Sequence, residues 1–270
     1  MLTRHATQNG TRWAYNGEWL ADSFSLRLLA NVARDNVLDV VRSCAVGGAT
    51  GGTPLAPVDD DTEVWAAGVT YLRSREARMH ESDTADVYDK VYDAERPEIF
   101  FKCAGWRARG DGQPIRIRRD ASWNVPEPEL ALVSNASGEI IGYTAGNDVS
   151  SRDIEGANPL YLPQAKVYDG SCALGPGIVL CSADDMRALP ITLTIERDGA
   201  TIFGGDTGIT QMKRTLEELV QCLYSELDLP GGSVLLTGAG LVPADDFTLN
   251  QGDRVVITVG ELSLSNTVTS

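Results

Sequence analysis

The strongest constraint on the fold is a pair of apolar segments separated by one short polar stretch. The first segment reads PELALV at residues 128–133, and the second reads EIIGYTAG at residues 139–146. Residues 135–138 between them, Asn-Ala-Ser-Gly, are typical of a turn. This order predicts an antiparallel hairpin that ends at Asp148.

Three carboxylates lie at the open end of this hairpin. Glu127 and Glu129 are two residues apart, so their side chains point to one face of an extended strand. We expect Asp148 to lie opposite Val125 and next to Glu127, which brings all three carboxylates to that face. They repel one another unless a cation lies among them, and oxygen ligands favour Mg²⁺ first, with Mn²⁺ or Ca²⁺ behind it. A solvated strand face is the alternative interpretation of the E-x-E spacing.

The composition argues against several classes of protein. The 270-residue chain carries a net charge of −15, which disfavours binding to nucleic acid or to an anionic membrane surface. Its five cysteines form no C-x-x-C pair, as expected for reduced thiols in a cytoplasmic protein. The first residues lack an apolar signal segment, and no apolar run is long enough to span a bilayer. We therefore expect a cytoplasmic protein without a membrane or nucleic-acid partner.

The sequence predicts two units. Residues 1–60 form a small α/β domain, with a short strand pair over residues 11–19 and an amphipathic helical segment that is broken near residue 35. A stretch rich in Gly, Pro and Asp at 47–61 predicts a linker. Residues 61–270 form the second and larger domain.

The larger unit is rich in strands, shows no β-α-β alternation, and is predicted to be α+β and mainly β. The clearest amphipathic helix covers residues 215–226, and residues 149–176 are predicted to be mostly loop. Lys102 lies inside an apolar strand, where it either reaches an edge or faces a site. Besides the hairpin, strands are predicted at 64–71, 98–105, 114–120, 177–181, 191–197, 200–206 and 253–268.

The charged stretch at residues 72–97 follows the strand at 64–71 directly. Its position predicts a loop or lid over a site, because loops on a rigid scaffold often carry function. An ordinary solvated helix is the alternative interpretation.

Together these segments resemble the fumarylacetoacetate hydrolase superfamily over about residues 62–268. The resemblance implies a mixed β-roll catalytic domain, commonly a homodimer or a dimer of dimers, that binds one Mg²⁺ or Mn²⁺ ion. The matching pieces are GVTY at 68–71, PEIFFK at 97–102, PEPELALV at 126–133, GYTAGNDVSSRD at 142–153, QAKVYDGSCALGP at 164–176, SVLLTGAG at 233–240 and GDRVVITVGELSLSNTV at 252–268.

The resemblance also implies roles for individual residues. Members act on small 2-oxo acids or 1,3-dicarbonyl acids. The metal ligands would be Glu127, Glu129 and Asp148, the same three residues that the hairpin selects. Lys166 matches the family lysine beside the metal. Thr237-Gly238 matches the backbone that receives a substrate carboxylate.

One departure from the family pattern bears on the reaction. Many hydrolases and decarboxylases of this family continue the strand as N-Y-x-x-H-A-x-E, where His and Glu activate water. Here Ser74 stands at the His position and Ala77 at the Glu position. The usual base for water attack is therefore missing, although His80 and Glu81 lie a few residues further on. The pattern GVTYLRSREARMHES instead resembles the branch that dehydrates 2-keto-3-deoxy-arabinonate or -xylonate, a step of pentose catabolism.

That resemblance leads to a mechanistic hypothesis. A metal ion on the 2-oxo acid favours loss of a C3 proton, and departure of the C4 hydroxyl then leads to 2,5-dioxopentanoate. Lys166 would move the C3 proton, and Glu81 first or Glu76 second would help the hydroxyl leave, with His80 as a further candidate. Candidate substrate contacts are Arg73, Ser74, Arg75, Lys102, Thr237 and Gly238. The alternatives are an acylpyruvate-type C–C hydrolase, an oxaloacetate decarboxylase, or a metal-binding protein without turnover.

Overall fold

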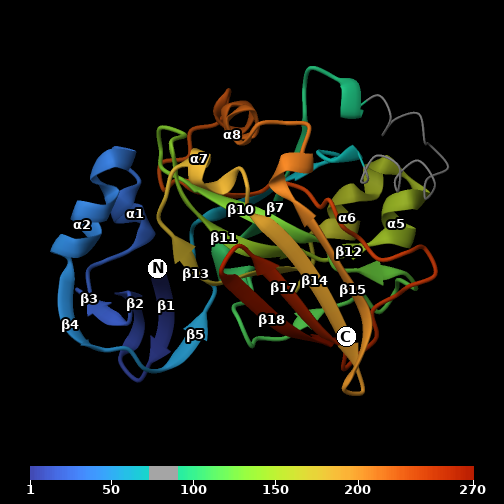
Figure 1. The fold of residues 1–270 in the computed structure, drawn as a ribbon, viewed down its shortest axis with the longest axis horizontal. Coiled ribbons are helices and arrows are strands. Elements are labelled where there is room, and N and C mark those ends of the chain that lie inside the picture. Colours follow the sequence, from blue (N-terminus) through green and yellow to red (C-terminus); the bar gives the residue numbers. More distant parts are fainter. Residues whose placement is uncertain (73–90) are drawn as a thin grey trace.

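The computed structural model of the protein describes residues 1–72 and 91–270. In these residues the strands form three sheets, which confirms the prediction of a mainly β fold (Figure 1). The largest sheet has eleven strands in the order β4-β3-β2-β1-β13-β11-β10-β16-β6-β7, with β5 attached to β1. The second has five, in the order β15-β14-β17-β18-β8, and β9 and β12 form a small pair.

The first sixty residues add one wing to the large sheet, the blue part of Figure 1. The predicted strand pair is present and turns at Asn16-Gly17, both with positive φ. The helical segment is interrupted at 34–36 as predicted, but the predicted linker at 47–61 contains strand residues. The elements of this part are β1 (Leu2–Thr7), β2 (Gly10–Tyr15), β3 (Glu18–Leu20), α1 (Leu26–Leu29), η1 (Arg34–Asn36), α2 (Val37–Ser43), β4 (Ala45–Ala49) and β5 (Thr53–Leu55).

The linker prediction failed because β4 and β5 are stabilised by pairing with strands that lie earlier in the chain. β5 pairs with β1, and β4 pairs with β3. β1 in turn reaches the rest of the sheet through the pair Leu2 and Ile178. The division into two domains stays a prediction, since the sheet runs through both parts.

The predicted hairpin forms the middle of the large sheet, from β10 (Pro128–Ser134) and β11 (Ile140–Asp148). Every residue of both strands is buried, which explains why their apolar pattern alternates only loosely. Outward from β10 lie β16 (Ser233–Leu236), the parallel strand β6 (Glu63–Gly68) and β7 (Glu98–Ala104). On the side of β11 lies β13 (Cys172–Val179).

The hairpin register differs from the expected one by two residues. Asp148 lies opposite Glu127, whose carbonyl accepts the Asp148 N–H at 3.1 Å, and Val125 pairs with Ser150 instead. A bulge after Val133 and a turn closed by the Asn135 side chain set this register, and apolar spacing does not reveal either feature. A shift of two residues preserves the face of every side chain, so the carboxylates still converge.

The five-stranded sheet packs on one face of the hairpin. Leu130 and Leu132 of β10 join its core, whereas Ala131 and Val133 point to the other face, toward the N-terminal helices. The predicted turn at Asp198-Gly199 is confirmed. The predicted single strand at 253–268 is a hairpin, and the one at 114–120 keeps only two paired residues. The strands are β8 (Ile115–Arg116), β14 (Pro190–Arg197), β15 (Ala200–Gly208), β17 (Arg254–Val259) and β18 (Leu262–Thr269).

The helices of the second unit include one clear success and one failure of prediction. In α8 (Leu216–Tyr224) the predicted apolar stripe is buried, and Thr215 and Glu218 form a capping box at its start. Residues 149–176 were predicted as mostly loop but contain two short α-helices, α5 and α6. Each has too few turns to produce a helical period of apolar residues in the sequence. The remaining elements are η2 (Gly105–Arg107), β9 (Asn124–Val125), β12 (Ser150–Ser151), α5 (Arg152–Ala157), η3 (Pro159–Tyr161), α6 (Leu162–Lys166), α7 (Ala183–Met186) and η4 (Ile209–Gln211).

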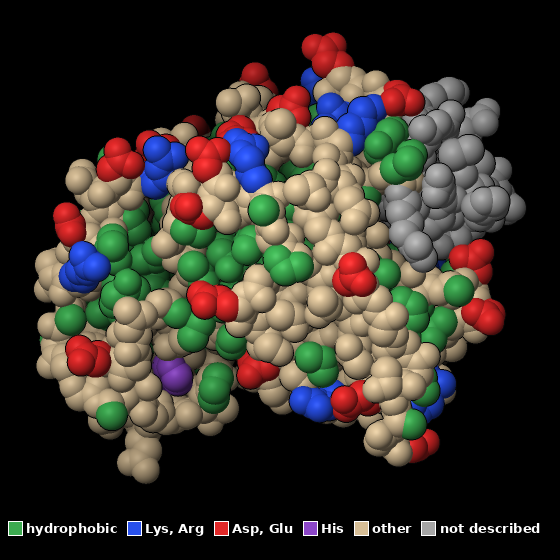
Figure 2. All heavy atoms as spheres, viewed as in Figure 1, with side chains coloured by type: hydrophobic (Ala, Val, Ile, Leu, Met, Phe, Trp, Pro, Cys, Tyr) green, Lys and Arg blue, Asp and Glu red, His purple; other side chains and the backbone are tan. Residues whose placement is uncertain are grey.

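No helix within the described ranges is both long and apolar enough to cross a membrane. Figure 2 shows acidic side chains scattered over one face of the molecule, with lysines and arginines among them.

Candidate metal centre

Three buried carboxylates meet at the open end of the hairpin. Oxygens of Glu127, Glu129 and Asp148 lie within 4.8 Å of one another, and each residue is at most 4% exposed. The two glutamates come from the chain that enters and begins β10, and the aspartate ends β11 directly across from Glu127. The E-x-E spacing and the hairpin therefore bring together the three residues that the sequence analysis selected.

The surroundings shift the pKa of Glu129 and that of Asp148 in opposite directions. Burial raises the pKa of Glu129 well above its usual value, and the charges of Asp148 and Glu127 raise it further. The backbone N–H of Gly238 donates to Glu129 at 2.6 Å and partly offsets this effect. Burial acts to raise the pKa of Asp148 too, but Lys102 and Lys166 outweigh it and hold that pKa below its usual value.

Lys166 joins the carboxylates from the end of α6. Its Nζ lies 2.9 Å from Glu127 Oε2 and 3.0 Å from Asp148 Oδ2. The residue is 1% exposed but lines the pocket, so its ammonium group can meet a bound ligand.

Lys102 of β7 contacts the other carboxylate oxygen of Asp148. Its Nζ pairs with Asp148 Oδ1 and also donates to the backbone carbonyls of Val149 and Lys166. An ammonium group has three donors, and these three acceptors use them all. Lys102 is fully buried and is not part of the pocket lining. This position favours a supporting role over the substrate contact that the sequence analysis considered.

A second buried ion-pair network lies on the other side of Glu127 and was missed by sequence reasoning. Arg152, at the start of α5, donates to Glu127 Oε1 at 3.0 Å and lies 3.5 Å from Glu155 Oε2. Ser150 donates to the same Glu155 oxygen at 2.8 Å. The only available signal was the position of Arg152 within the motif GYTAGNDVSSRD, three residues before Glu155 on a helix.

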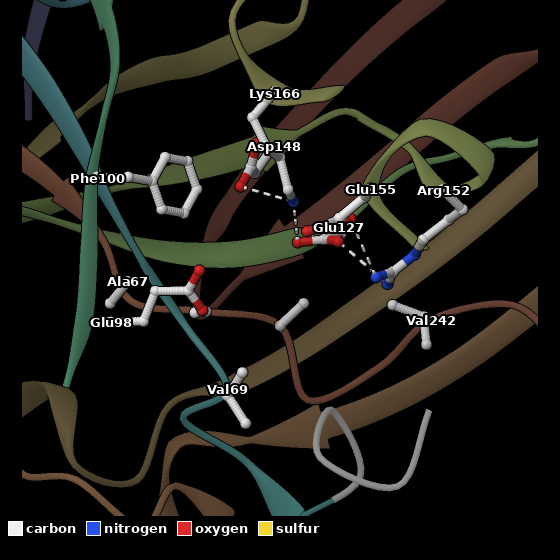
Figure 3. A pocket seen from close by; sticks show the side chains of 13 residues that line it. Ala67, Val69, Glu98, Phe100, Glu127, Asp148, Arg152, Glu155, Lys166 and Val242 are labelled. Atoms are coloured by element: carbon white, nitrogen blue, oxygen red, sulfur yellow. Dashed lines mark hydrogen bonds and ion pairs between the residues drawn. The ribbon is translucent and has the colours of Figure 1, made fainter. Parts of the chain in front are cut away.

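These side chains line a small pocket (Figure 3). Its polar lining comes from Glu127, Asp148, Lys166, Arg152, Glu155 and Glu98, and its apolar lining includes Val69, Phe100 and Val242. Figure 3 shows Glu98 and Arg152 entering this pocket from opposite sides. Glu98, the first residue of β7, lies in the segment PEIFFK and is a second site residue for which the sequence predicted no role.

The predicted carboxylate-binding backbone forms another part of the pocket wall. The hydroxyl of Thr70 donates to the carbonyl of Thr237 at 2.6 Å, and Gly238, with φ of +93°, lines the pocket. The Gly238 N–H is the donor already described at Glu129. In this structure the predicted receiver of a substrate carboxylate therefore orients a carboxylate of the protein.

The remaining candidate residues, Arg73, Ser74, Arg75, Glu76, His80 and Glu81, lie outside the described residues, and their roles stay predictions.

The donor set fits a divalent metal ion. Three carboxylates supply oxygen ligands only, which suits hard cations, and their mutual repulsion is relieved by a cation among them. Lys166 lowers the pKa of Glu129, but burial and the charges of Asp148 and Glu127 outweigh it, so negative charge from two neighbouring carboxylates still acts on Glu129.

Comparison with known proteins points in one direction. Residues 63–269 match the sequence model described as fumarylacetoacetate (FAA) hydrolase C-terminal. A Haloferax volcanii protein named "probable 2-keto-3-deoxyxylonate dehydratase" is 50% identical over 216 residues, which cover 79% of this chain and 74% of the relative. The 2-dehydro-3-deoxy-D-arabinonate dehydratase of Saccharolobus solfataricus is 44% identical over 211 residues, covering 75% and 70%.

One solved structure extends the similarity to the whole chain. It is described as 2-keto-3-deoxy-D-arabinonate dehydratase complexed with magnesium and 2,5-dioxopentanoate. Its TM-score with this chain is 0.84 at 33% identity, and the match covers 99% of this chain and 98% of that one.

Proposed function

The chain belongs to the fumarylacetoacetate hydrolase family, and from that premise we propose that it is a Mg²⁺-dependent dehydratase of 2-keto-3-deoxy pentonates. Its substrate is of the arabinonate or xylonate type, and its products are 2,5-dioxopentanoate and water. The observation that carries the proposal is the pocket itself, where Glu127 and Asp148 of the buried carboxylate triad lie with Lys166 and Glu98 in one lining. The relatives at 44% and 50% identity bear dehydratase names.

Glu127, Glu129 and Asp148 are the residues that would hold the ion. Their carboxylates suit Mg²⁺, Mn²⁺ and Ca²⁺ alike, and we prefer Mg²⁺ because the similar dehydratase structure contains magnesium. When bound, the ion supplies a Lewis acid that draws charge from the 2-oxo group of the substrate and makes the C3 protons more acidic. The protein supports these ligands through Arg152, which holds one Glu127 oxygen, and through the Gly238 N–H, which orients Glu129.

Lys166 is the residue that we assign to the C3 proton. Its Nζ belongs to the pocket lining and contacts two of the three carboxylates, Glu127 at 2.9 Å and Asp148 at 3.0 Å. In the structure Lys166 pairs with Glu127 and Asp148, which favours its ammonium form. The neutral amine would be favoured by a divalent ion on those carboxylates, and it would accept the C3 proton while the electron pair of the C–H bond moves toward the 2-oxo group. Lys102 holds the backbone carbonyl of Lys166 and so fixes the base of that side chain.

Glu98 is the described residue best placed to assist the leaving hydroxyl. It lines the pocket, is half-buried and is not one of the three carboxylates of the triad. As a carboxylic acid it gives a proton to the C4 hydroxyl, the C4–O bond breaks, and one water leaves. Tautomerisation then turns the C5 alcohol carbon into an aldehyde, so the atoms of the pentonate equal those of 2,5-dioxopentanoate plus water. Glu81 and Glu76 stay alternatives for the same task.

A coupled assay tests the proposal. Purified protein is incubated with Mg²⁺ and racemic 2-keto-3-deoxy-pentonate, and 2,5-dioxopentanoate is measured with an aldehyde dehydrogenase. We expect turnover that a chelator abolishes and that excess Mg²⁺ restores. Glu129→Gln, which removes one carboxylate charge while keeping the size of the side chain, should lose that turnover.

Parallel reactions decide between this activity and others on the same scaffold. Consumption of acetylpyruvate or oxaloacetate without formation of 2,5-dioxopentanoate would replace the dehydratase by a hydrolase or decarboxylase. Mg²⁺ binding without turnover of any of the three substrates would instead indicate a metal-binding protein.

A further inference from the structure

The carboxylate of Glu98 occupies the space that a side chain at position 68 would need. Gly68 ends β6 and lies directly across from Glu98 on β7. A Cβ atom built on Gly68 would lie 2.0 Å from Glu98 Oε2 and 2.7 Å from its Cδ. Real Cβ atoms do not approach other atoms this closely, so any larger residue at position 68 moves the carboxylate.

The backbone does not explain the glycine. The φ angle of Gly68 lies outside the left-handed region, so an alanine could adopt the same conformation. The three nearest atoms all belong to the Glu98 side chain. What the glycine provides at this position is therefore open space for one carboxylate.

We propose that Gly68 is a positioning residue that sets the direction of the Glu98 carboxylate in the pocket. The inference rests on the proposed function, because it matters only where Glu98 gives a proton to the leaving hydroxyl. The atoms that an alanine would meet are the far end of the Glu98 side chain, not the backbone of the β6–β7 ladder. Gly68→Ala therefore moves an acid group and leaves the sheet intact.

Kinetics of four variants test the inference: Gly68→Ala, Glu98→Gln, the double variant, and Gly204→Ala. Gly204 is the matched control, since it is also a strand glycine but is exposed and has open space around its Cβ position. We expect Gly68→Ala to lower kcat at least about tenfold, because a positioned general acid typically contributes 10²–10⁴-fold. KM and the Mg²⁺ concentration for half-maximal activity should stay within about twofold, because Glu98 is not part of the carboxylate triad.

The double variant separates positioning from a general effect on the protein. If Gly68 acts through Glu98, Gly68→Ala costs nothing further once Glu98 is glutamine, and the double variant equals Glu98→Gln. Gly204→Ala should retain wild-type kinetics. Independent losses that multiply in the double variant would overturn the proposal, as would a Gly68→Ala enzyme with wild-type kcat.

A crystal structure of Gly68→Ala gives a readout that does not depend on activity. The expected result is a displaced Glu98 carboxylate with the pairing of β6 and β7 unchanged. A carboxylate that stays in place while the strands move apart would contradict the proposal. If the wild-type protein fails to dehydrate any 2-keto-3-deoxy pentonate, the proposed function fails, and the crystal structure still decides whether Gly68 positions Glu98.

Discussion

Asp148 contacts two lysines, Lys166 and Lys102, for which we expect different roles. Lys166 and Lys102 both contact Asp148, yet only Lys166 lines the pocket. The ammonium of Lys102 is surrounded by one carboxylate and two backbone carbonyls. We therefore expect replacement of Lys166 to reduce chiefly catalysis and replacement of Lys102 to reduce chiefly stability.

Lys166→Met should lower kcat by about 10²-fold or more, because it removes the group assigned to the C3 proton. Mg²⁺ should still raise the melting temperature, since the three carboxylates remain. The measurement is steady-state turnover together with thermal unfolding at several Mg²⁺ concentrations. Lys166→Arg is the control, because it keeps the charge beside Glu127 and Asp148 but cannot accept a proton. Wild-type turnover in either variant would show that another group moves the C3 proton.

Lys102→Met should lower the free energy of unfolding by about 3–5 kcal/mol, because it leaves the buried Asp148 without one of its cations. Urea unfolding measures the change. The matched control is Lys213→Met: Lys213 pairs with Asp93 in a partly exposed position, where loss of the pair should cost about 1 kcal/mol or less. Equal losses in the two variants would indicate that the buried pair contributes no more than an exposed one.

The residues of the site were predictable to the extent that local spacing encodes them. The E-x-E pair and the hairpin pointed to the three carboxylates but left a solvated strand face as an alternative, and the family resemblance favoured the metal site. Glu98 and Arg152 were missed because each becomes part of the site through long-range pairing, of β7 with β6 and of β12 with β9 just before α5. No local pattern distinguishes their charges from those of a solvated surface.

At the scale of elements, prediction succeeded where order depends on neighbours in sequence and failed where it depends on distant partners. The β10–β11 hairpin, the β14–β15 turn and α8 were predicted, and each has a local turn or capping signal. α5 and α6 were missed because they contain only six and five residues. Helices this short show no helical period in the sequence. They are also unstable alone, so tertiary packing must stabilise them.

The end of β6 carries a conformational feature that the sequence did not reveal. Val69 has a φ of +53° and is only 7% exposed. A β-branched residue rarely adopts this left-handed conformation, which costs on the order of 1–3 kcal/mol. The turn directs the next residue, Thr70, to the carbonyl of Thr237, so the strain lies beside the pocket.

Val69→Gly should therefore change the free energy of unfolding by only about 1 kcal/mol or less, because relief of strain offsets the lost side chain. Val64→Gly, within β6 and fully buried without a positive φ, should cost about 3 kcal/mol or more. Urea unfolding of the two variants measures the difference. Similar losses in both would show that the Val69 backbone is not strained.

At the scale of the whole molecule, the metal ion should act as part of the fold. The carboxylate triad joins β10 with β11, and Glu129 is also held by the chain after β16, so one bound ion stabilises contacts among all three. Assembly as a homodimer or a dimer of dimers stays a prediction.

Mg²⁺ should raise the melting temperature, and a concentration a hundredfold above its Kd should add about 2.7 kcal/mol to the free energy of unfolding. Differential scanning fluorimetry with and without a chelator measures the effect, and titrations with Mn²⁺ and Ca²⁺ rank the ions. Glu129→Gln should shift much less on addition of Mg²⁺. A melting temperature indifferent to all three ions would contradict a metal site at the triad.

The position of β16 in the large sheet bears on how the protein is made. This strand, residues 233–236, lies between β10 and the much earlier β6, and the residue that orients Glu129 follows it directly. During synthesis β6 and β10 leave the ribosome well before the strand that joins them, and such long-range pairing is slow. The edges of β6 and β10 therefore lack the strand that joins them until residues 233–236 have been made. The part of the pocket wall that Gly238 forms is therefore completed only late in synthesis.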